Sequence, residues 1–263
     1  MAAAGAARPY DRRVVRVAPP PLLSLAVLGE PLVALEGAAG TGLVVACLAA
    51  AYLLGTVPTA VVVAGRWGVD PRLSGSGNPG ATNVARTAGW RPGALTLAGD
   101  LAKGMAATGL GWAAGGRTLG VACGAVAVLG HVAPATRRFR GGKGVATAAG
   151  VALVAFPLAT LAAAAGFALA AGVSRRASVG SLAAVATLPV AAGALGAPGV
   201  EVAALAACGA LVAARHRTNI ERLVRGTEPP LWPRRAGALR SGFRPGPSGE
   251  GFPPHGSAEP DDT

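Results

Sequence analysis

Long uncharged runs of apolar residues, separated by short basic stretches, form the main pattern of the chain. Most runs are long enough to cross a membrane as an α-helix. A span takes about 20 apolar residues, because every backbone polar group must be bonded within the segment. The pattern therefore predicts an all-α integral membrane protein. The runs cover approximately residues 43–65, 93–116, 118–135, 145–173, 178–198 and 199–214.

The run 145–173 does not fit a single span. One straight helix over it would be about 43 Å long at ~1.5 Å per residue, against a hydrocarbon core of about 30 Å. It also starts and ends beside basic stretches, so the chain must enter and leave on the same side. Phe156 and Pro157 offer a break within the run. We therefore predict two short helices here and about seven transmembrane helices in all.

Basic residues fall into four clusters beside these runs, and the clusters indicate the orientation. Lysine and arginine are enriched in cytoplasmic loops of membrane proteins. This rule places the clusters at the cytoplasmic face, with the N-terminus outside and the C-terminus inside. The arginines at 8, 12, 13 and 16 would then lie outside, which a translocated tail or a start codon further downstream would explain. The clusters are Arg66, Arg72, Arg86 and Arg91; Arg137, Arg138, Arg140 and Lys143; Arg175 and Arg176; and Arg215, Arg217, Arg222 and Arg225.

Three regions follow from this reading of the chain. Residues 1–40 mix proline, arginine and short apolar patches without a full span, and we interpret them as an N-terminal tail. Residues 41–226 form the membrane domain. Residues 227–263 hold eight of the 21 prolines and are predicted to be a disordered, Pro/Gly-rich C-terminal tail.

Composition changes this picture little. The net charge of +12 comes from basic residues beside apolar segments, where they mark topology and contact anionic lipids, so we expect no nucleic-acid partner. Cys47, Cys123 and Cys208 lie within apolar runs and lack a CxxC spacing. We therefore expect neither a disulfide framework nor a metal site, and assign the cysteines to packing.

The stretch GSGNPGATNVAR at residues 75–86 concentrates glycine and small polar residues in an otherwise apolar chain. A glycine-rich backbone can turn successive N–H groups toward one anion, and an arginine fork suits two phosphate oxygens. Gly75, Gly77, Ser76, Asn78, Thr82, Asn83 and Arg86 are therefore candidate phosphate-binding residues. The alternative is a tight Gly/Asn turn followed by a helix cap.

A second stretch, RRFRGGKGVATA at residues 137–148, repeats this logic. Gly141 and Gly142 precede Lys143 where a helix begins, so exposed N–H groups, the helix dipole and an ammonium would converge. Gly144 replaces the hydroxyl residue of a Walker A loop, which argues against an ATPase. Of the 24 basic residues only Lys103 and Lys143 are lysines, which favours a specific use of the ammonium over an ordinary basic loop.

A third stretch, ARHRTNIERLVRGTEP, covers residues 214–229. His216 and Asn219 are three residues apart and so share a helix face. Arg217, Arg222 and Arg225 take other faces, where we expect them to contact anionic lipid head groups. Glu221 follows His216 as in a His-x4-Asp acyltransferase dyad, but the acid has the wrong length, and we do not assign His216 as a base.

Charged residues also occur inside the predicted helices. Asp100 and Lys103 lie three residues apart, close enough to pair, and such groups at membrane depth need a partner or a function. We expect them to form an ion pair that could support a site. We expect His131, near the end of its run, to be a hydrogen-bonded residue between helices.

The motifs together resemble a known family in their order and spacing. GTVPTA (55–60), GSGNPGATNVAR (75–86), GDLAKG (99–104), GHVAPA (130–135), RGGKGVATA (140–148) and RHRTNIERLVRGTEP (215–229) are similar to those of the bacterial acyl-phosphate-dependent glycerol-3-phosphate acyltransferases, the PlsY family. The resemblance covers about residues 45–230. It departs from the family at Pro79, where an aliphatic residue is usual.

The resemblance implies a seven-helix enzyme of the bacterial inner membrane. Such an enzyme transfers a fatty acyl group from acyl phosphate to the 1-hydroxyl of glycerol 3-phosphate, giving lysophosphatidic acid and phosphate, an early step of phospholipid synthesis. It implies no cofactor or metal and no conventional protein base, because the substrate's own phosphate takes the hydroxyl proton. The partners implied are the two substrates, membrane lipids and the enzyme that supplies acyl phosphate.

The resemblance also assigns roles to the candidate residues. Ser76, Arg86 and Lys143 are the catalytic candidates. Ser76, Gly77, Asn78 and Lys143 are placed on the acyl-phosphate side, and Arg86, Lys143, His216 and Asn219 on the glycerol 3-phosphate side. Gly75, Thr82, Asn83, Gly141 and Gly142 complete the pocket.

Two other functions remain open at this point. A transporter of a phosphorylated anion would also need cationic glycine-rich elements, but would hold its site near the membrane midplane and open to both sides in turn. Three of the four polar groupings here lie at one face, which favours an enzyme at the interface. An acyltransferase that uses acyl-CoA is the second alternative.

Overall fold

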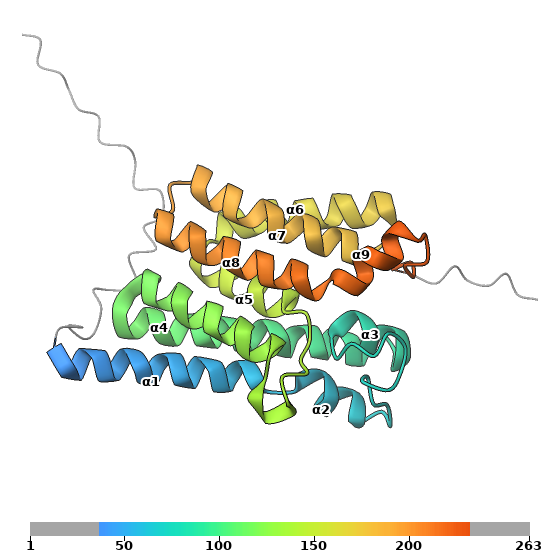
Figure 1. Cartoon of the computed structure of the whole chain (residues 1–263), viewed down its shortest axis with the longest axis horizontal. Helices are drawn as coiled ribbons and strands as arrows, with labels where there is room; N and C mark the ends of the chain where they lie inside the picture. Colours follow the sequence, from blue (N-terminus) through green and yellow to red (C-terminus); the bar gives the residue numbers. More distant parts are fainter. Residues whose placement is uncertain (1–36, 232–263) are drawn as a thin grey trace, which may run out of the picture.

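Helices make up the regular structure of residues 37–231, the part of the chain that the computed structural model describes (Figure 1). The N-terminal arginines and most of the predicted C-terminal tail lie outside these residues. The helices are α1 (Gly37–Thr56), α2 (Thr59–Gly65), α3 (Ala81–Thr87), α4 (Trp90–Val132), α5 (Val145–Ala155), α6 (Pro157–Ser174), α7 (Ala177–Ala194), α8 (Gly199–Arg215) and α9 (Arg217–Val224), with a 3-10 turn η1 (Ala135–Arg137).

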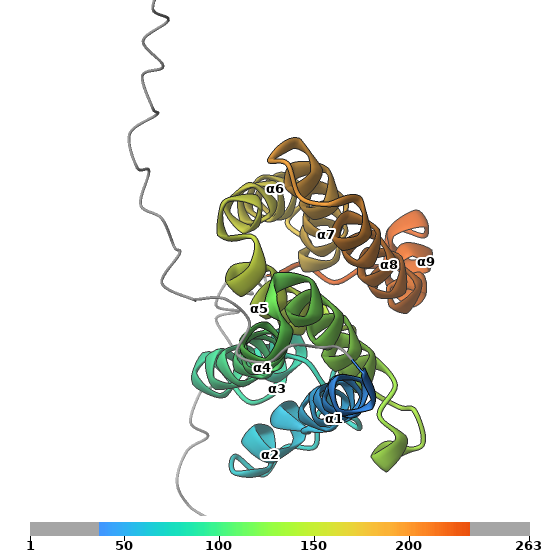
Figure 2. The same ribbon diagram turned by 90° about the vertical axis from the view of Figure 1, so that its left-hand side faces the viewer.

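The helices form two groups joined by α5. Seen end-on, α1, α2 and α3 lie with α4 on one side, and α6, α7 and α8 on the other (Figure 2). The connection 66–80 and α9 lie at one end of the bundle, on the right in Figure 1, and the connection 133–144 lies nearer to the middle. These segments carry members of three basic clusters: Arg66 and Arg72; Arg137, Arg138, Arg140 and Lys143; and Arg217 and Arg222.

The long helix α4 is a hairpin. Gly115 and Gly116 leave the helical conformation, and Gly116 has a φ of 79°, which a glycine adopts without strain. The arms 90–114 and 117–132 then pack against each other. They come so close that a Cβ on Gly120 would lie 2.8 Å from the carbonyl oxygen of Thr108. The two predicted runs 93–116 and 118–135 are thus separate helices joined by a glycine turn.

The predicted first span differs from the structure. The helix begins at Gly37 rather than near residue 43, and it is interrupted at Val57 and Pro58 before α2 starts. Proline has no N–H and disfavours helical conformation in the residue before it, so the helix stops here. At the break the Val57 carbonyl accepts hydrogen bonds from the Thr59 N–H at 3.0 Å and from the Lys103 ammonium at 3.2 Å.

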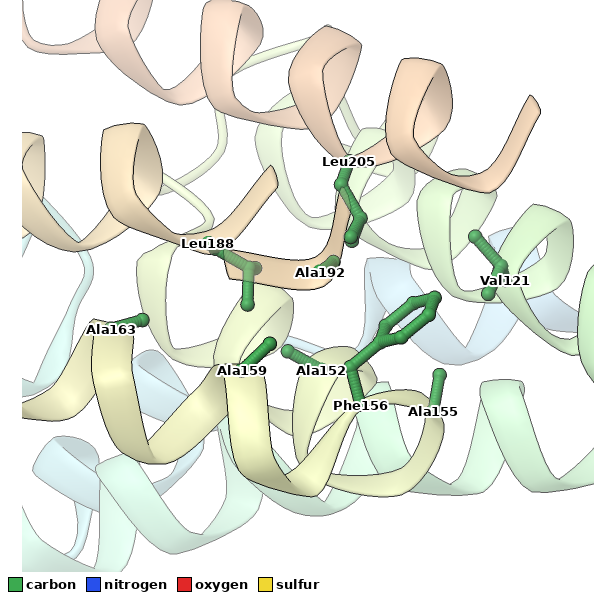
Figure 3. Close-up of a cluster of buried hydrophobic side chains, with 9 residues drawn as sticks. All are labelled: Val121, Ala152, Ala155, Phe156, Ala159, Ala163, Leu188, Ala192 and Leu205. Carbon is green, nitrogen blue, oxygen red and sulfur yellow. The ribbon is translucent and has the colours of Figure 1, made fainter. Parts of the chain in front are cut away.

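The break predicted in the run 145–173 is confirmed. Phe156 is non-helical, with φ −143° and ψ 63°, and Pro157 opens α6 at a position where its missing N–H costs nothing. The Phe156 ring points into the space between Leu205 and Val121, where the largest apolar cluster lies (Figure 3). The cluster therefore joins α4 to α5–α8 at the far end from the basic loops.

Among the described residues, four helices are long and apolar enough to span a membrane, or five if the pair α8 and α9, bent by 56°, is counted as one span. That count takes the α4 hairpin as one helix and leaves out the short α5. The fold is all-α, as predicted. The seven transmembrane helices and their orientation stay predictions.

Glycines allow the closest contacts between helices. A Cβ on Gly55 of α1 would collide with the backbone of Ala127 in α4, and Gly130 of α4 meets the backbone of Tyr52 in the same way. Small residues are the usual means of close helix packing in lipid, where no hydrophobic force draws helices together. Backbone contact therefore holds α1 against α4.

We expect Gly55→Ala to destabilise the protein by about 1–3 kcal/mol, because the added methyl group would push backbone against backbone. Gly42→Ala is the matched control on the same helix, since nothing lies within 4 Å of its Cβ position. Thermal unfolding of both variants in detergent checks this expectation. Equal melting temperatures for the two variants would contradict it.

Candidate active site

One cavity of about 520 Å³ lies where the predicted motifs meet. Its polar end is formed by the 75–86 segment, the loop before α5 and the junction of α8 with α9. Eight of the predicted site residues line it: Ser76, Asn78, Thr82, Asn83, Arg86, Lys143, His216 and Asn219. Three stretches far apart in sequence therefore share one site.

The rest of the cavity is an apolar arm. Its wall consists of small and branched side chains of three helices, which leaves a channel between them. The wall includes Ala148, Ala149 and Ala152 of α5, Ala163, Ala164 and Phe167 of α6, and Ala184, Val185 and Leu188 of α7. The cavity thus suits a ligand with a polar head and a long apolar tail.

Asn83 organises the first loop. Its amide is only 2% exposed, accepts a hydrogen bond from the Ser76 N–H, and donates to the carbonyls of Pro71 and Ser74, each at 2.9 Å. A Cβ on Gly75 would collide with this amide, and Gly75 has a φ of +61°. Gly75 must therefore be glycine for the loop to close over Asn83.

The loop before α5 is fixed from two sides. The Gly142 N–H donates to the His131 carbonyl at 3.2 Å, and the Arg215 guanidinium donates to the Gly141 carbonyl at 3.0 Å. Gly144, with a φ of +88°, forms the N-cap of α5. The loop thus presents Lys143 beside the free N–H groups of the helix start. Four predicted site residues do not line the cavity: Gly75, Gly77, Gly141 and Gly142. Gly75, Gly141 and Gly142 have close neighbours and shape the loops around the cavity.

A chain of polar contacts links Lys143 to the end of the described chain. The Lys143 ammonium donates to Asn219 Oδ1 at 2.5 Å, Asn219 Nδ2 donates to Glu228 Oε1 at 2.7 Å, and Arg222 Nε donates to Glu228 Oε2 at 2.7 Å. Glu228 is 6% exposed. Each partner therefore holds the next one in place.

The assignment of Arg222 to lipid head groups was wrong. Arg222 lines the cavity and pairs with Glu228, because Gly226, with a φ of +71°, turns the chain back over α9. The structured region also continues beyond the predicted boundary at 226. Arg86 donates to the Pro230 carbonyl at 2.9 Å, and the Leu231 N–H donates to the Arg175 carbonyl at 2.7 Å.

Glu228, Asp100 and His131 are cavity residues that the sequence did not identify as part of the site. Glu228 lies within the motif that ends in RGTEP at residue 229, so its membership of the motif could have marked it as a site residue. Asp100 was recognised only as an ion-pair partner of Lys103, and the structure confirms that pair at 2.8 Å. His131 lies between helices as expected, and its ring also reaches the cavity.

Burial and neighbouring charges tune the site's titratable groups. Burial, aided by the guanidinium groups of Arg222, Arg86 and Arg215, lowers the pKa of Lys143 to about 8 although Glu228 opposes the shift. Burial raises the pKa of a carboxyl, but at Glu228 hydrogen bonds from Asn219 and Arg222 outweigh burial and lower it. Near neutral pH the site therefore has a net positive charge, as anion binding requires.

His216 is neutral in this environment. It is 2% exposed, and burial lowers its pKa below the usual value. Its Nδ1 lies 2.8 Å from the Val212 carbonyl, which only accepts, so Nδ1 carries the proton. Nε2 is left as a hydrogen-bond acceptor, which suits a hydroxyl group of a ligand.

Comparisons with known proteins point to one family. The family model described as glycerol-3-phosphate acyltransferase matches residues 45–226. A glycerol-3-phosphate acyltransferase of Geotalea daltonii is 42% identical over 186 residues, covering 68% of this chain and 92% of the relative. The protein of the same name from Bordetella pertussis is 44% identical over 195 residues, covering 70% and 89%.

Two solved structures show the same fold. Both are of PlsY, an integral membrane glycerol 3-phosphate acyltransferase, in forms named for glycerol 3-phosphate and for lysophosphatidic acid. Each is 34% identical and covers 71% of this chain and 94% of the solved one, with TM-scores of 0.69 and 0.67. The fold and the sequence therefore agree.

The pKa of Lys143 predicts how phosphate binding depends on pH. The ammonium is protonated below about 8, so the affinity for inorganic phosphate should fall as the pH rises through this value, by up to about tenfold per pH unit. Bound phosphate stabilises the ammonium and shifts the fall upward. Lys143→Arg should flatten the profile, since arginine stays charged. Calorimetric titration in detergent measures both, and an equal fall in the variant would remove Lys143 as the cause.

Proposed function

The chain belongs to the glycerol-3-phosphate acyltransferase family, and we propose that it transfers a fatty acyl group from acyl phosphate to the 1-hydroxyl of glycerol 3-phosphate. The products are lysophosphatidic acid and inorganic phosphate. The family places the protein in the bacterial cell membrane. One observation carries the proposal: a single cavity joins a cationic, glycine-rich end to an apolar arm. Acyl phosphate has this same division into an anionic head and an apolar tail.

The reaction requires two phosphates close together. The hydroxyl oxygen attacks the acyl carbonyl carbon, the bond from that carbon to the phosphate oxygen breaks, and the leaving phosphate takes the hydroxyl proton. No protein base is then needed. Cavity carboxylates are already engaged, Glu228 by Arg222 and Asn219, and Asp100 by Lys103 and Thr59. Positioning and charge stabilisation supply the catalysis.

The residues divide between the two substrates. Ser76, Asn78 and Lys143 hold the acyl phosphate, with Gly77 shaping the loop that carries the first two, while Arg86, Lys143, His216 and Asn219 hold glycerol 3-phosphate. The acceptor nitrogen of His216 orients a glycerol hydroxyl. Lys143 is shared, which places its ammonium between the two anions. The solved relatives named for their glycerol 3-phosphate and lysophosphatidic acid forms support this acceptor and product.

The proposal includes a topology. The site's loops face the cytoplasm, the N-terminus lies outside, and α1, the two arms of α4, α5, α6, α7 and α8 are the seven membrane helices. The membrane domain then extends to Leu231, with tails on either side. A site confined to one end of the bundle supports an interfacial enzyme over a transporter with a midplane site.

Phosphate release by the purified protein tests the reaction. We expect release from palmitoyl phosphate to depend on glycerol 3-phosphate and to yield lysophosphatidic acid, and Lys143→Ala to abolish it. Palmitoyl-CoA serves as the parallel donor. Turnover with palmitoyl-CoA alone would overturn the donor, and no turnover with either donor in folded protein would favour transport of a phosphorylated anion.

Arg86→Lys should raise the KM for glycerol 3-phosphate about tenfold, because lysine cannot hold two phosphate oxygens and the Pro230 carbonyl with one planar group. Arg91→Lys is the matched control. Arg91 belongs to the same basic cluster but stacks on Trp90, 5.5 Å from its ring centre. Steady-state kinetics with both variants decides the matter, and an unchanged KM in Arg86→Lys would restrict Arg86 to a topological role.

A further inference from the structure

Four polar side chains form a buried network beneath the loop that carries Lys143. Asp100 accepts hydrogen bonds from the Lys103 ammonium, at 2.8 Å, and from the Thr59 hydroxyl. Lys103 also lies 2.6 Å from His131 Nδ1. Asp100 and Lys103 are 2% and 6% exposed. Ionisable groups are expensive at this depth in a membrane protein and are retained where they serve a function.

For a charged Lys103, counting donors and acceptors assigns one tautomer to His131. An ammonium has three protons and no acceptor, and Lys103 has three acceptors around it: Asp100 Oδ1, the Val57 carbonyl and His131 Nδ1. Nδ1 must therefore offer its lone pair. The ring is then neutral, with its proton on Nε2, because the hydrogen bond at one ring nitrogen decides which nitrogen is protonated.

The protonated nitrogen lies against the loop that carries Lys143. A Cβ on Gly142 would collide with His131 Nε2, so this nitrogen contacts the loop residue that precedes Lys143. His131 also lines the cavity. Within residues 37–231, Nε2 has no hydrogen-bond partner, while the same ring's Nδ1 is fully used. His131 thus lines the cavity and has a donor that no described residue of the protein uses.

The position along the cavity indicates which ligand atom this donor meets. Lys143 and Asn219 mark the end that holds phosphate, and Ala148 and Ala152 of α5 mark the apolar arm. His131 contacts the loop just before α5, between these two regions. In an acyl phosphate the carbonyl group is the part between phosphate and chain.

We propose that His131 is a further catalytic residue, whose Nε2–H donates to the carbonyl oxygen of the acyl donor and stabilises the negative charge that this oxygen gains during attack. Asp100, Lys103 and Thr59 are positioning residues, since they hold the ring in the donor tautomer. A neutral donor suits this task because it has no full charge to compete with Lys143 for the phosphates. The inference rests on the proposed acyl-phosphate reaction.

Nitrogen NMR on protein with histidine labelled by nitrogen-15 tests the inference in the wild-type chain. The sequence has only three histidines, so His131→Gln and His216→Gln assign the site signals. Without substrate we expect the Nε2–H tautomer at His131. The Nδ1–H tautomer or a doubly protonated ring would overturn the inference, whatever reaction the protein catalyses.

Two unreactive probes then ask what the donor binds. A β-ketophosphonate with a palmitoyl chain keeps the carbonyl group, and an alkylphosphonate of equal length lacks it. Calorimetric titration in detergent reports occupancy, and we expect both probes to bind but only the ketophosphonate to shift His131 Nε2. Binding of both probes without a response of His131 would overturn the inference alone. Failure of both probes to bind would count against the acyl-phosphate donor, and the inference would fall with it.

Kinetics give a third measurement. His131→Leu should lower kcat about 100-fold, the usual effect of losing one such donor, with the KM for glycerol 3-phosphate nearly unchanged. His131→Gln places an amide donor near the same position and should recover much of the loss. Thr96→Val is the control, because Thr96 is fully buried on the same helix but bonds only to its own turn. Equal kcat in the Leu and Gln variants would contradict a donor role.

Discussion

The structure depends on keeping a half-buried lysine charged at the polar end of the cavity. An isolated ammonium removed from water is costly, so it needs oxygen partners and nearby negative charge. Lys143 obtains them from Asn219 and, through Asn219, from Glu228. Those partners come from the opposite end of the domain's sequence. The hydrogen bonds that the Lys143 ammonium needs therefore connect the loop before α5 to α9 and to the segment after α9.

Two lysines need partners for a charged ammonium, and the structure provides them differently. Lys103 has a carboxylate, a carbonyl and an imidazole around it, which use all its protons. Lys143 has one direct protein partner among the described residues and is left with protons for a ligand. Of the only two lysines in the chain, Lys103 thus has a protein partner for every N–H, and Lys143 does not. Lys103 does not line the cavity and holds its neighbours Asp100 and His131 in place, whereas Lys143 lines the cavity and, in the proposed function, binds the substrates there.

Sequence patterns identified the helices and eight of the polar residues that line the cavity, because hydropathy and glycine clusters are local signals. The break at Phe156 followed from run length and basic clusters, and the separation of α4 into two arms from the runs 93–116 and 118–135, but the turn at Gly115 and Gly116 was not predicted. Arg222 and Glu228 could not be placed in this way. Their contact depends on the turn at Gly226, which brings together residues whose spacing alone favours separate surroundings. The sequence shows Pro58, which can break a helix. It does not show the hydrogen bond from the Lys103 ammonium to the Val57 carbonyl, because that bond depends on how α4 packs beside the break.

The short helix α5 sets the depth of the apolar arm. Eleven residues at ~1.5 Å each extend about 16 Å, roughly half of a hydrocarbon core of about 30 Å. Leu188, the furthest residue of α7 that lines the arm, lies at a similar distance from the start of its helix. A chain held in this arm stays within one leaflet. In the reaction that we propose, donor and product would then share that leaflet, and new lipid would enter the membrane on the side where its head group is made, without crossing to the other.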